Sequence, residues 1–482
     1  METGMTGTPG GNWLRGKRTL VMGLGTRQGG LGVTRYLAEQ GADVTVTDLR
    51  TAADLDPIIR ELSGLPIRFV LGEHRREDFE TAEIVVRNPA VPVRSPWLAI
   101  ARAAGAQIEM EMSLFFRACP APIIGITGTK GKTTTATICA NILRLARPDT
   151  VLAGNMGASA LMALPRITPE TPVVIELSSW QLEGLAEHGM SPYIAVLTNI
   201  SEDHLNAYPS MAEYIEAKRH IARFQEPGDW FIVNRDHPPA WESRHTGAGR
   251  IIPFGFDRDL DAEQGAWLDG DRLIWQWAGI DREICRLSDL PIPGPATAMN
   301  ALAASAAALL MGASETEAHA ALATQQPIPY RQEPVATIDG VLYVNDTAAT
   351  APAAAIAALD AYWGRPVVLI AGGASKRSDL TALASRAAAQ AEAVVLLDGS
   401  ATPEFRQLLL EAGARNLSGP HNAMEPAVRA AATFARPGSV VLLAPGCASF
   451  GIFRDEFHRG DDFRSAVDQL AMAASASTED RP

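Results

Sequence analysis

The sequence predicts an α/β protein of three domains in series, each built on a mainly parallel sheet. Short apolar runs typical of buried strands alternate with helix-like segments along the whole chain. Proline-rich joints at residues 119–122 and 327–329 interrupt this alternation. The length of 482 residues also exceeds what one core needs, because a domain holds roughly 150 residues. We therefore expect domains at residues 1–120, 121–327 and 328–482.

The composition limits the class of protein. The chain is 47% hydrophobic and 20% charged, as globular proteins are. Its net charge of −13, with no long Lys/Arg run, argues against nucleic-acid binding. No segment has 18 or more uninterrupted apolar residues, and the N-terminus lacks the apolar core of a signal peptide, so we expect a cytoplasmic protein without membrane insertion. Four scattered cysteines predict reduced thiols rather than disulfides or a zinc site.

The first block begins as a βαβ unit. A strand over residues 19–23 leads through a glycine-rich turn into a helix, and a second strand over residues 44–47 ends at Asp48. The turn reads GLGTRQGGLG, but Gln28 stands where a G-x-G-x-x-G fingerprint needs glycine. This predicts a Rossmann-like domain without indicating a nicotinamide cofactor. The Gly/Thr/Pro-rich start and the tail from about Ala474 are expected to be disordered.

The second block opens with a strand over residues 123–126, followed by the loop GITGTKGKTTT and a helix. Glycines let backbone N–H groups surround phosphate oxygens, and a helix N-terminus favours negative charge. Lys132 would neutralise the β- and γ-phosphates, and Thr133 would offer its hydroxyl to Mg²⁺. Ile126 replaces the first glycine of the usual GxxxxGK[ST] spacing. The loop predicts ATP binding.

Polar residues follow the neighbouring strands of this block. The strand over residues 173–177 carries Glu176, and the strand over residues 194–198 leads into a loop with His204. A carboxylate and an imidazole beside a triphosphate are suitable Mg²⁺ ligands. A helix capped by Ser210 and Glu213 follows, with Lys218 on its apolar face. A lysine there either extends past the core edge to solvent or takes part in chemistry.

The third block repeats the alternation, with strands expected over residues 341–344, 367–371, 394–397 and 440–443. With all three blocks assembled, the chain resembles the Mur ligase family over most of its length. Within that family it is most similar to the members that add D-glutamate to UDP-N-acetylmuramoyl-L-alanine. The matching stretches are GITGTKGKTTT, GNMG (154–157), ELSSWQLE (176–183), NISEDHLNAYPSMAEYIEAK (199–218), NDTAAT (345–350), GGASK (372–376) and APGCASF (444–450).

The resemblance implies a monomeric, ATP-dependent peptide synthase of cytoplasmic peptidoglycan biosynthesis. It implies that the first domain binds the UDP substrate, the second ATP and the third glutamate. It also implies two Mg²⁺ sites and a carbamate formed from CO₂ on Lys218, which burial favours by disfavouring the charged amine. The implied catalytic residues are Lys132, Glu176, His204 and Lys218. The implied metal ligands are Thr133, Glu176, His204 and Lys218.

The resemblance also implies three groups of binding residues. The ATP group is Gly128, Thr129, Lys130, Gly131, Lys132, Thr133, Thr134, Asn300, Arg331 and Asp346. The UDP-substrate group is Gly25, Thr26, Asp48, Arg50, Asn88, Asn155, Ser178 and Gln181. The glutamate group is Thr350, Lys376, Ser449, Phe450 and Phe457.

The chain departs from the family pattern at several positions that handle adenine and glutamate. Asn206 and Ala207 replace a charged pair after the histidine, and Ala296 and Thr297 replace the histidine and first asparagine of an HNxxN motif. Ala348 stands where lysine is common, and Glu456 where an aromatic residue is frequent. Three alternatives therefore stay open: an L-glutamate-adding Mur ligase, a folylpolyglutamate synthase, and a nucleotide-sugar sensor without catalysis.

Overall fold

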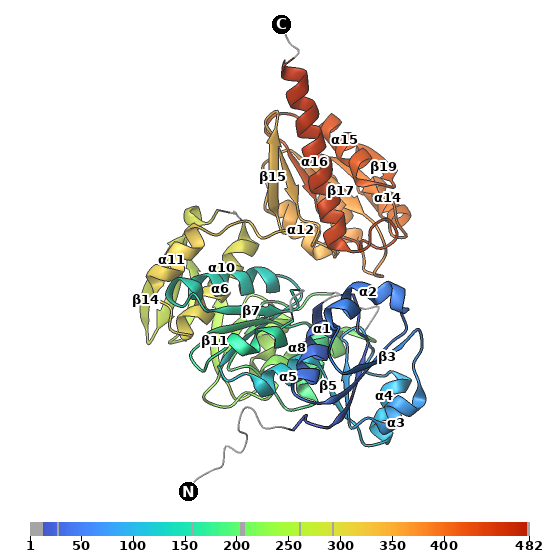
Figure 1. Ribbon diagram of the computed structural model, residues 1–482. Helices are drawn as coiled ribbons and strands as arrows, with labels where there is room; N and C mark the ends of the chain where they lie inside the picture. The colour runs from blue at the N-terminus through green and yellow to red at the C-terminus, as the bar shows by residue number, and fades with distance from the viewer. Residues whose placement is uncertain are drawn as a thin grey trace.

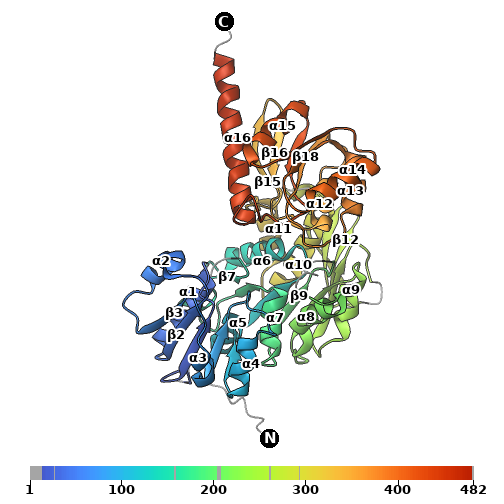
Figure 2. The ribbon, with the colours of Figure 1, turned by 90° about the vertical axis from the view of Figure 1, so that its right-hand side faces the viewer.

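The chain folds into three α/β domains, each with one sheet (Figure 1). The computed structural model describes residues 13–26, 28–156, 159–202, 208–259, 262–291 and 294–479. The N-terminal and middle domains lie side by side, and the C-terminal domain stands at one end of the pair in both ribbon views (Figures 1 and 2). The predicted fold class is confirmed.

The N-terminal sheet is parallel, with the strand order β3-β2-β1-β4-β5. Its strands are β1 (Arg18–Met22), β2 (Asp43–Asp48), β3 (Ile67–Leu71), β4 (Ile84–Arg87) and β5 (Gln107–Glu109). Its helices are α1 (Gln28–Glu39), α2 (Ala52–Glu61), α3 (Arg76–Thr81), α4 (Pro96–Ala103) and α5 (Glu111–Ala118). The strand order reverses between β1 and β4, and open α/β sheets bind ligands at the carboxyl ends of strands at such a point.

The middle sheet has the order β14-β13-β12-β11-β10-β9-β6-β8-β7. Its strands are β6 (Ile123–Thr127), β7 (Val151–Gly154), β8 (Val173–Glu176), β9 (Ile194–Leu197), β10 (Trp230–Asn234), β11 (Arg250–Gly255), β12 (Gly265–Asp269), β13 (Arg272–Trp277) and β14 (Ile280–Arg286). Its helices are α6 (Lys132–Ala146), η1 (Leu161–Arg166), α7 (Ser179–Ala186), α8 (Met211–Arg223), α9 (Pro238–Trp241), η2 (Glu242–His245), η3 (Leu287–Asp289), α10 (Pro295–Leu310) and α11 (Glu315–Ala323).

The middle sheet extends further than the sequence analysis anticipated. Strands β12, β13 and β14 pair antiparallel, whereas the strands from β7 to β12 pair in parallel. Tight turns join the added strands, and Gly270 and Gly279 take positive φ angles in them. The phosphate-loop strand β6 stays near the other end of the sheet, between β8 and β9.

The C-terminal sheet has the order β15-β16-β20-β17-β18-β19, in which only β15 is antiparallel to its described neighbour. Its strands are β15 (Glu333–Ile338), β16 (Val341–Asn345), β17 (Val367–Gly372), β18 (Ala391–Leu397), β19 (Leu417–His421) and β20 (Val440–Leu443). Its helices are α12 (Pro352–Asp360), α13 (Thr381–Gln390), α14 (Thr402–Glu411), α15 (Met424–Phe434) and α16 (Glu456–Glu479).

Helix α16 corrects one expectation. It continues to Glu479, so the prediction of a disordered tail from Ala474 is wrong for residues 474–479. The segment before this point is rich in alanine, which has the highest helix propensity, and a helix already docked on the sheet extends at little cost. No helix within the described ranges is both long and apolar enough to cross a membrane.

The cores distinguish the third domain from the other two. One buried apolar cluster contains residues of both the N-terminal and the middle sheet, such as Val21, Val46, Ile175 and Leu197. The C-terminal sheet has separate clusters on its two faces. Shared burial of apolar surface fixes two units to each other. The first two domains therefore form one base, and the third is joined to it through the segment between α11 and β15.

Candidate active site

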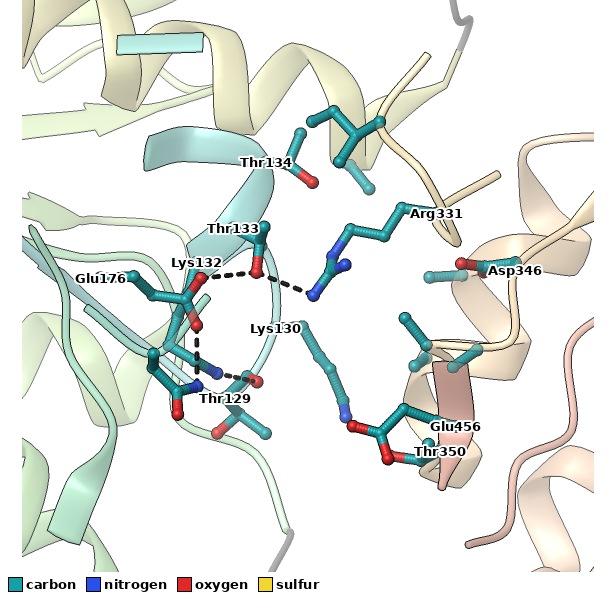
Figure 3. A pocket seen from close by; sticks show the side chains of 18 of the residues that line it. Thr129, Lys130, Lys132, Thr133, Thr134, Glu176, Arg331, Asp346, Thr350 and Glu456 are labelled. Atoms are coloured by element: carbon teal, nitrogen blue, oxygen red, sulfur yellow. Dashed lines mark hydrogen bonds between the residues drawn. The ribbon is translucent and has the colours of Figure 1, made fainter. Parts of the chain in front are cut away.

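A cavity of about 700 Å³ lies between the middle and C-terminal domains. The phosphate loop, the start of α6 and the end of β8 form one wall. The segment between α11 and β15 and two loops of the C-terminal domain form the opposite wall. Figure 3 shows side chains of both walls pointing into the space between them.

The phosphate loop connects β6 to α6. Gly131 has φ +83°, and a Cβ there would lie 2.3 Å from Asn300 Oδ1, so only glycine fits this close approach. The Lys132 Nζ donates to the carbonyls of Gly128 and Thr129, both at 3.0 Å. The loop therefore holds a cation beside a helix N-terminus, an arrangement that attracts phosphate.

A buried carboxylate lies next to this loop because β8 pairs with β6 in a register that aligns Glu176 with Ile126. The Glu176 Oε2 accepts a hydrogen bond from Thr133 Oγ1 at 2.6 Å. Its Oε1 accepts one from Asn155 Nδ2 at 3.0 Å. A hydroxyl and a carboxylate thus converge, as a hard divalent cation requires of its oxygen ligands.

Lys218 of α8 contacts the same phosphate loop. Helix α8 begins after Ser210, whose Oγ accepts the backbone N–H of Glu213 at 3.3 Å, which is the Ser210 half of the predicted capping box. The Lys218 side chain is only 2% exposed, so it does not extend to solvent. Its Nζ donates to the Gly128 carbonyl at 2.8 Å and lies 4.8 Å from the centre of the Tyr214 ring. The Tyr214 hydroxyl lies 3.2 Å from Thr129 Oγ1, so this ring contacts both the lysine and the phosphate loop.

The predicted histidine ligand, His204, lies outside the described residues, as do Asn206 and Ala207. Among the residues that the structure does describe, no group of three or more His, Cys, Asp or Glu side chains is placed to hold a metal ion. The described oxygen donors at the phosphate loop are Thr133 and Glu176, and they fit part of a Mg²⁺ coordination shell.

Two charged residues face the phosphate loop from the other wall (Figure 3). The Arg331 guanidinium donates to Thr133 Oγ1 at 2.8 Å and so bridges the walls. Asp346 is buried, and burial raises its pKa to about 6, although Arg331 and Lys130 oppose this rise. Figure 3 shows Lys130 extending from the loop toward Glu456 at the start of α16.

The predicted glutamate residues line the same wall of the cavity. The Lys376 Nζ donates to Thr350 Oγ1 at 3.0 Å. Ser449 is buried, whereas Phe450 is 64% exposed. Phe457 packs edge-on against Tyr330, with ring centres 5.2 Å apart. These five residues thus bring together one cation, two hydroxyls and two aromatic rings.

Arg459 on α16 is a residue that the sequence analysis did not single out. Its side chain is fully buried and donates from Nε to Thr347 Oγ1 at 2.9 Å, from Nη2 to the Thr347 carbonyl at 3.0 Å and from Nη1 to the Cys447 carbonyl at 3.3 Å. Burial lowers its pKa to about 10. It therefore ties together the two loops that carry Thr350 and Ser449. Arg459 stands four residues before the buried Phe463, and this spacing in the sequence could have placed Arg459 on the buried face of the helix.

The predicted UDP residues fall into two places. At the switch point of the N-terminal sheet, Asp48 accepts the backbone N–H groups of Gly25 at 3.0 Å and Arg50 at 2.9 Å. The Asn88 side chain donates to the Gly23 carbonyl at 3.2 Å in the same turn. Thr26 is exposed beside them. None of these residues lines the cavity between the middle and C-terminal domains.

The remaining three predicted UDP residues belong to the middle domain. Asn155 and Ser178 line the cavity. Gln181 is buried and caps α7 reciprocally with Ser178: the Gln181 backbone N–H donates to Ser178 Oγ at 3.3 Å, and Gln181 Oε1 accepts the Ser178 N–H at 2.9 Å. This bond network fixes the start of α7 beside Glu176.

Together the fold and the cavity define a class of protein. A phosphate loop with a carboxylate in one domain faces a lysine and hydroxyls in another, as in an ATP-dependent ligase that brings a nucleotide and a second substrate together. Family models agree over all three domains: the Mur ligase MurD-like N-terminal domain matches residues 17–109, the Mur ligase middle domain residues 126–308, and the Mur ligase glutamate ligase domain residues 330–447. The chain belongs to the Mur ligase family, whose members are ATP-dependent amide-bond-forming ligases that use Mg²⁺.

Similar proteins cover almost the whole chain. A UDP-N-acetylmuramoylalanine–D-glutamate ligase of Roseiflexus sp. (strain RS-1) is 52% identical, over 95% of this chain and 99% of the relative. The ligase of the same name from Symbiobacterium thermophilum is 36% identical, over 94% and 98% of the two chains. Among solved structures, the UDP-N-acetylmuramate-alanine ligase MurC of Thermotoga maritima has a TM-score of 0.60 at 19% identity, covering 94% of this chain and all 100% of its own. That likeness supports the fold.

Proposed function

We propose that this chain joins D-glutamate to UDP-N-acetylmuramoyl-L-alanine with ATP, a step of peptidoglycan biosynthesis. The observation that carries the proposal is the end-to-end identity of 52% with a ligase of that name. The cavity supports it, because a phosphate loop and a cationic, hydroxyl-lined wall face each other there. We place the reaction in the cytoplasm, where ATP is available, and assign it to a monomer, since one chain supplies both walls.

The proposed chemistry has two steps. The L-alanine carboxylate attacks the γ-phosphorus of ATP, which forms an acyl phosphate and releases ADP. The glutamate amine then attacks the acyl carbon, loses a proton, and expels inorganic phosphate as the amide forms. A carboxylate is a poor electrophile, and its phosphorylation supplies a leaving group.

The residues around the phosphate loop stabilise charge in both steps. The loop amides of residues 128–134 would surround the phosphates, and Lys132 and Arg331, which bond to this loop and to the start of its helix, would stabilise the charge of the transferring group. Thr133 and Glu176 would hold Mg²⁺, which neutralises phosphate charge when it is bound. His204, which lies outside the described residues, is the further ligand that the family resemblance implies.

The proposed role of Lys218 is to carry a carbamate. Its neutral amine would attack CO₂ and lose a proton, which turns a cation into an anionic ligand for a second Mg²⁺. Full burial supports this role, because desolvation disfavours the ammonium form. So does its position against Gly128, beside the loop that would bind the phosphates.

The three domains would bring the substrates together. The turn at Gly25, Asp48 and Asn88 would bind the uridine diphosphate, in the domain of residues 1–120. The domains of residues 121–327 and 328–482 would bind ATP and glutamate. Separate cores for the third domain support a closing motion before chemistry.

An enantiomer-resolved ligation assay tests this function. Purified chain is given ATP, UDP-N-acetylmuramoyl-L-alanine and either D- or L-glutamate, and the product is measured by mass. We expect product only with D-glutamate. Product only with L-glutamate would show that the chain is an L-glutamate-adding ligase. Glutamate addition only to a folate acceptor would show that it is a folylpolyglutamate synthase. Absence of any substrate-dependent phosphate release would favour a sensor.

A further inference from the structure

The segment that joins the middle domain to the C-terminal domain holds Arg331 between two residues of unusual backbone conformation. Tyr330 has φ +68° and Gln332 has φ +42°, and such angles are unfavourable for residues with a Cβ. A conformation of this kind persists only where the surrounding structure imposes it. The contacts that hold this turn therefore bear on Arg331, whose side chain faces the phosphate loop (Figure 3).

The backbone on both sides of Arg331 is bonded to the C-terminal domain. The Tyr330 N–H donates to Glu333 Oε2 at 2.8 Å, and the Gln332 N–H donates to Asp346 Oδ1 at 3.2 Å. Glu333 is the first residue of β15, and Asp346 directly follows β16. Arg331 therefore belongs mechanically to the third domain, although its guanidinium reaches the middle domain.

Helix α16 fixes this turn through Arg464. The Arg464 Nη2 donates to both carboxylate oxygens of Glu333 at 2.8 Å, and its Nε donates to Glu333 Oε1 at 3.1 Å. The same guanidinium lies over the Tyr330 ring, 4.3 Å from the ring centre. The Tyr330 hydroxyl donates to Asp461 Oδ1 at 2.9 Å, which also accepts from Arg464 Nη1 at 2.8 Å. One arginine thus holds both the ring of Tyr330 and the carboxylate that accepts its N–H.

The pair of Arg464 and Glu333 is well placed to keep the turn in its unfavourable conformation. Their side chains are 28% and 17% exposed, so solvent screens them less than a surface pair, and several charge-assisted hydrogen bonds join them. Helix α16 also packs directly on the ring, because a Cβ at Gly460 would lie 2.5 Å from Tyr330 Cδ1. Loss of the pair would therefore free the turn without removing any group from the cavity.

We propose that Arg464 and Glu333 are positioning residues that hold the Arg331 guanidinium at the phosphates of ATP. The inference deepens the proposed function, because it rests on those phosphates occupying the loop of residues 128–134. Neither Arg464 nor Glu333 lines the cavity, so both act through Arg331, whose Nη2 donates to Thr133 Oγ1 at 2.8 Å. A cation that is fixed in advance needs no reorganisation when charge develops on the transferring group.

A double-mutant cycle separates positioning from a general effect on the structure. Arg464→Met, Arg331→Ala and the double variant are compared by kcat and by the KM for glutamate, both from phosphate release. The ratio of the Kd values for ADP and ATP, from equilibrium titration of the full chain, reports on the γ-phosphate alone. Arg464→Lys keeps the charge but not the planar fork. Arg429→Met, which removes an exposed arginine of α15 paired with Glu425, is the control.

We expect Arg331→Ala to lower kcat by about 10²–10³, the usual effect of removing one positioned charge. Arg464→Met should lower kcat by about tenfold, because the cation is displaced rather than removed, and should leave the KM for glutamate unchanged. Arg464→Lys should lose less, and Arg429→Met nothing. In the Arg331→Ala background Arg464→Met should have no further effect, because residues that act as a unit are not additive.

An equal loss of kcat in both backgrounds, or no loss in the wild-type background, overturns the inference. A rise in the KM for glutamate that matches the fall in kcat does so as well, since it shows a distorted wall. If the melting temperature shows that Arg464→Met does not fold, Glu333→Gln takes its place in the cycle, because it weakens the pair but keeps an acceptor for the Tyr330 N–H. If no acceptor supports turnover, the proposed function fails, and the Kd ratios decide the inference: Arg464→Met should weaken ATP relative to ADP only when Arg331 is present, and any other result overturns it.

Discussion

The two walls of the cavity differ in how they are held. On the middle-domain wall, Lys132, Glu176 and Lys218 all bond to the phosphate loop or its helix. These contacts arise inside one domain, from adjacent strands and a packed helix. On the opposite wall, Lys376 bonds to Thr350 within the C-terminal domain, and Phe450 is largely exposed.

This difference indicates that the middle-domain wall is preformed, whereas the C-terminal wall is brought to it by the position of the third domain. The middle-domain wall belongs to the base formed by the first two domains, which share a core. The C-terminal wall is carried by a domain with separate cores, and the bond from Arg331 to Thr133 is a described link between the walls. Substitutions in the first wall should therefore affect phosphoryl transfer itself, and substitutions in the second should affect the binding of the amino acid.

The largest effect is expected at Lys132. Lys132→Ala removes the cation held over the phosphate loop, and we expect kcat to fall by about 10²–10³ because a preorganised charge is lost. ADP release measures the effect. Lys17→Ala, which removes an exposed lysine paired with Glu83, serves as the control. If the Lys132→Ala variant released ADP at the wild-type rate, Lys132 would have no role in phosphoryl transfer.

A loss of similar kind but somewhat smaller size is expected at Lys218. Lys218→Ala would remove the carbamate and leave a buried space beside Tyr214 and Gly128. We expect a decrease in kcat of about 10², with partial recovery when a short-chain carboxylate is added to occupy the space. The Lys17→Ala variant should not respond to the acid. Full activity of Lys218→Ala without any added acid would refute the carbamate role.

The buried acid of the second wall gives a pH-dependent prediction. The pKa of Asp346 is raised to about 6 by burial, so the folded state binds its proton more tightly than the unfolded state does. Below about pH 3 both states are protonated and the effect vanishes, whereas above pH 6 ionisation costs the folded state about 1–3 kcal/mol. Asp346→Asn should therefore raise the free energy of unfolding at pH 8 and leave it unchanged near pH 3. Denaturant titrations at both pH values measure this, and an equal difference at both would contradict it.

The sequence predicted the preformed wall better than the assembled one. The phosphate loop follows β6 and Glu176 ends β8, and both strands are continuous apolar runs, so their placement at one sheet edge could be expected from the sequence. The contact of Lys218 with Gly128 spans 90 positions and depends on how α8 packs behind the sheet. Periodicity placed Lys218 on the buried face of its helix, but it could not indicate which loop the amine would meet.

Other features were missed for similar physical reasons. Arg459 links Thr347 to Cys447, and neither loop contains a pattern that specifies a buried guanidinium partner. The antiparallel strands β13 and β14 depend on pairing with an existing sheet edge, which local propensity does not encode. At the end of α16 the local composition did carry the information. The alanine-rich segment favours a helix, but the polar residues at the terminus led us to predict disorder.

The smallest effect is expected at Lys376, and it distinguishes the two walls most directly. Lys376→Ala removes the cation that Thr350 holds in place, so we expect the KM for glutamate to rise about tenfold, the cost of one charged hydrogen bond. The KM for ATP should change little, because the phosphate loop lies on the other wall. Initial rates over a matrix of glutamate and ATP concentrations separate the two constants, with Lys17→Ala as the matched lysine control. Unchanged glutamate saturation would remove Lys376 from the amino-acid site, and an equal rise in both KM values would mean that the walls are coupled rather than independent.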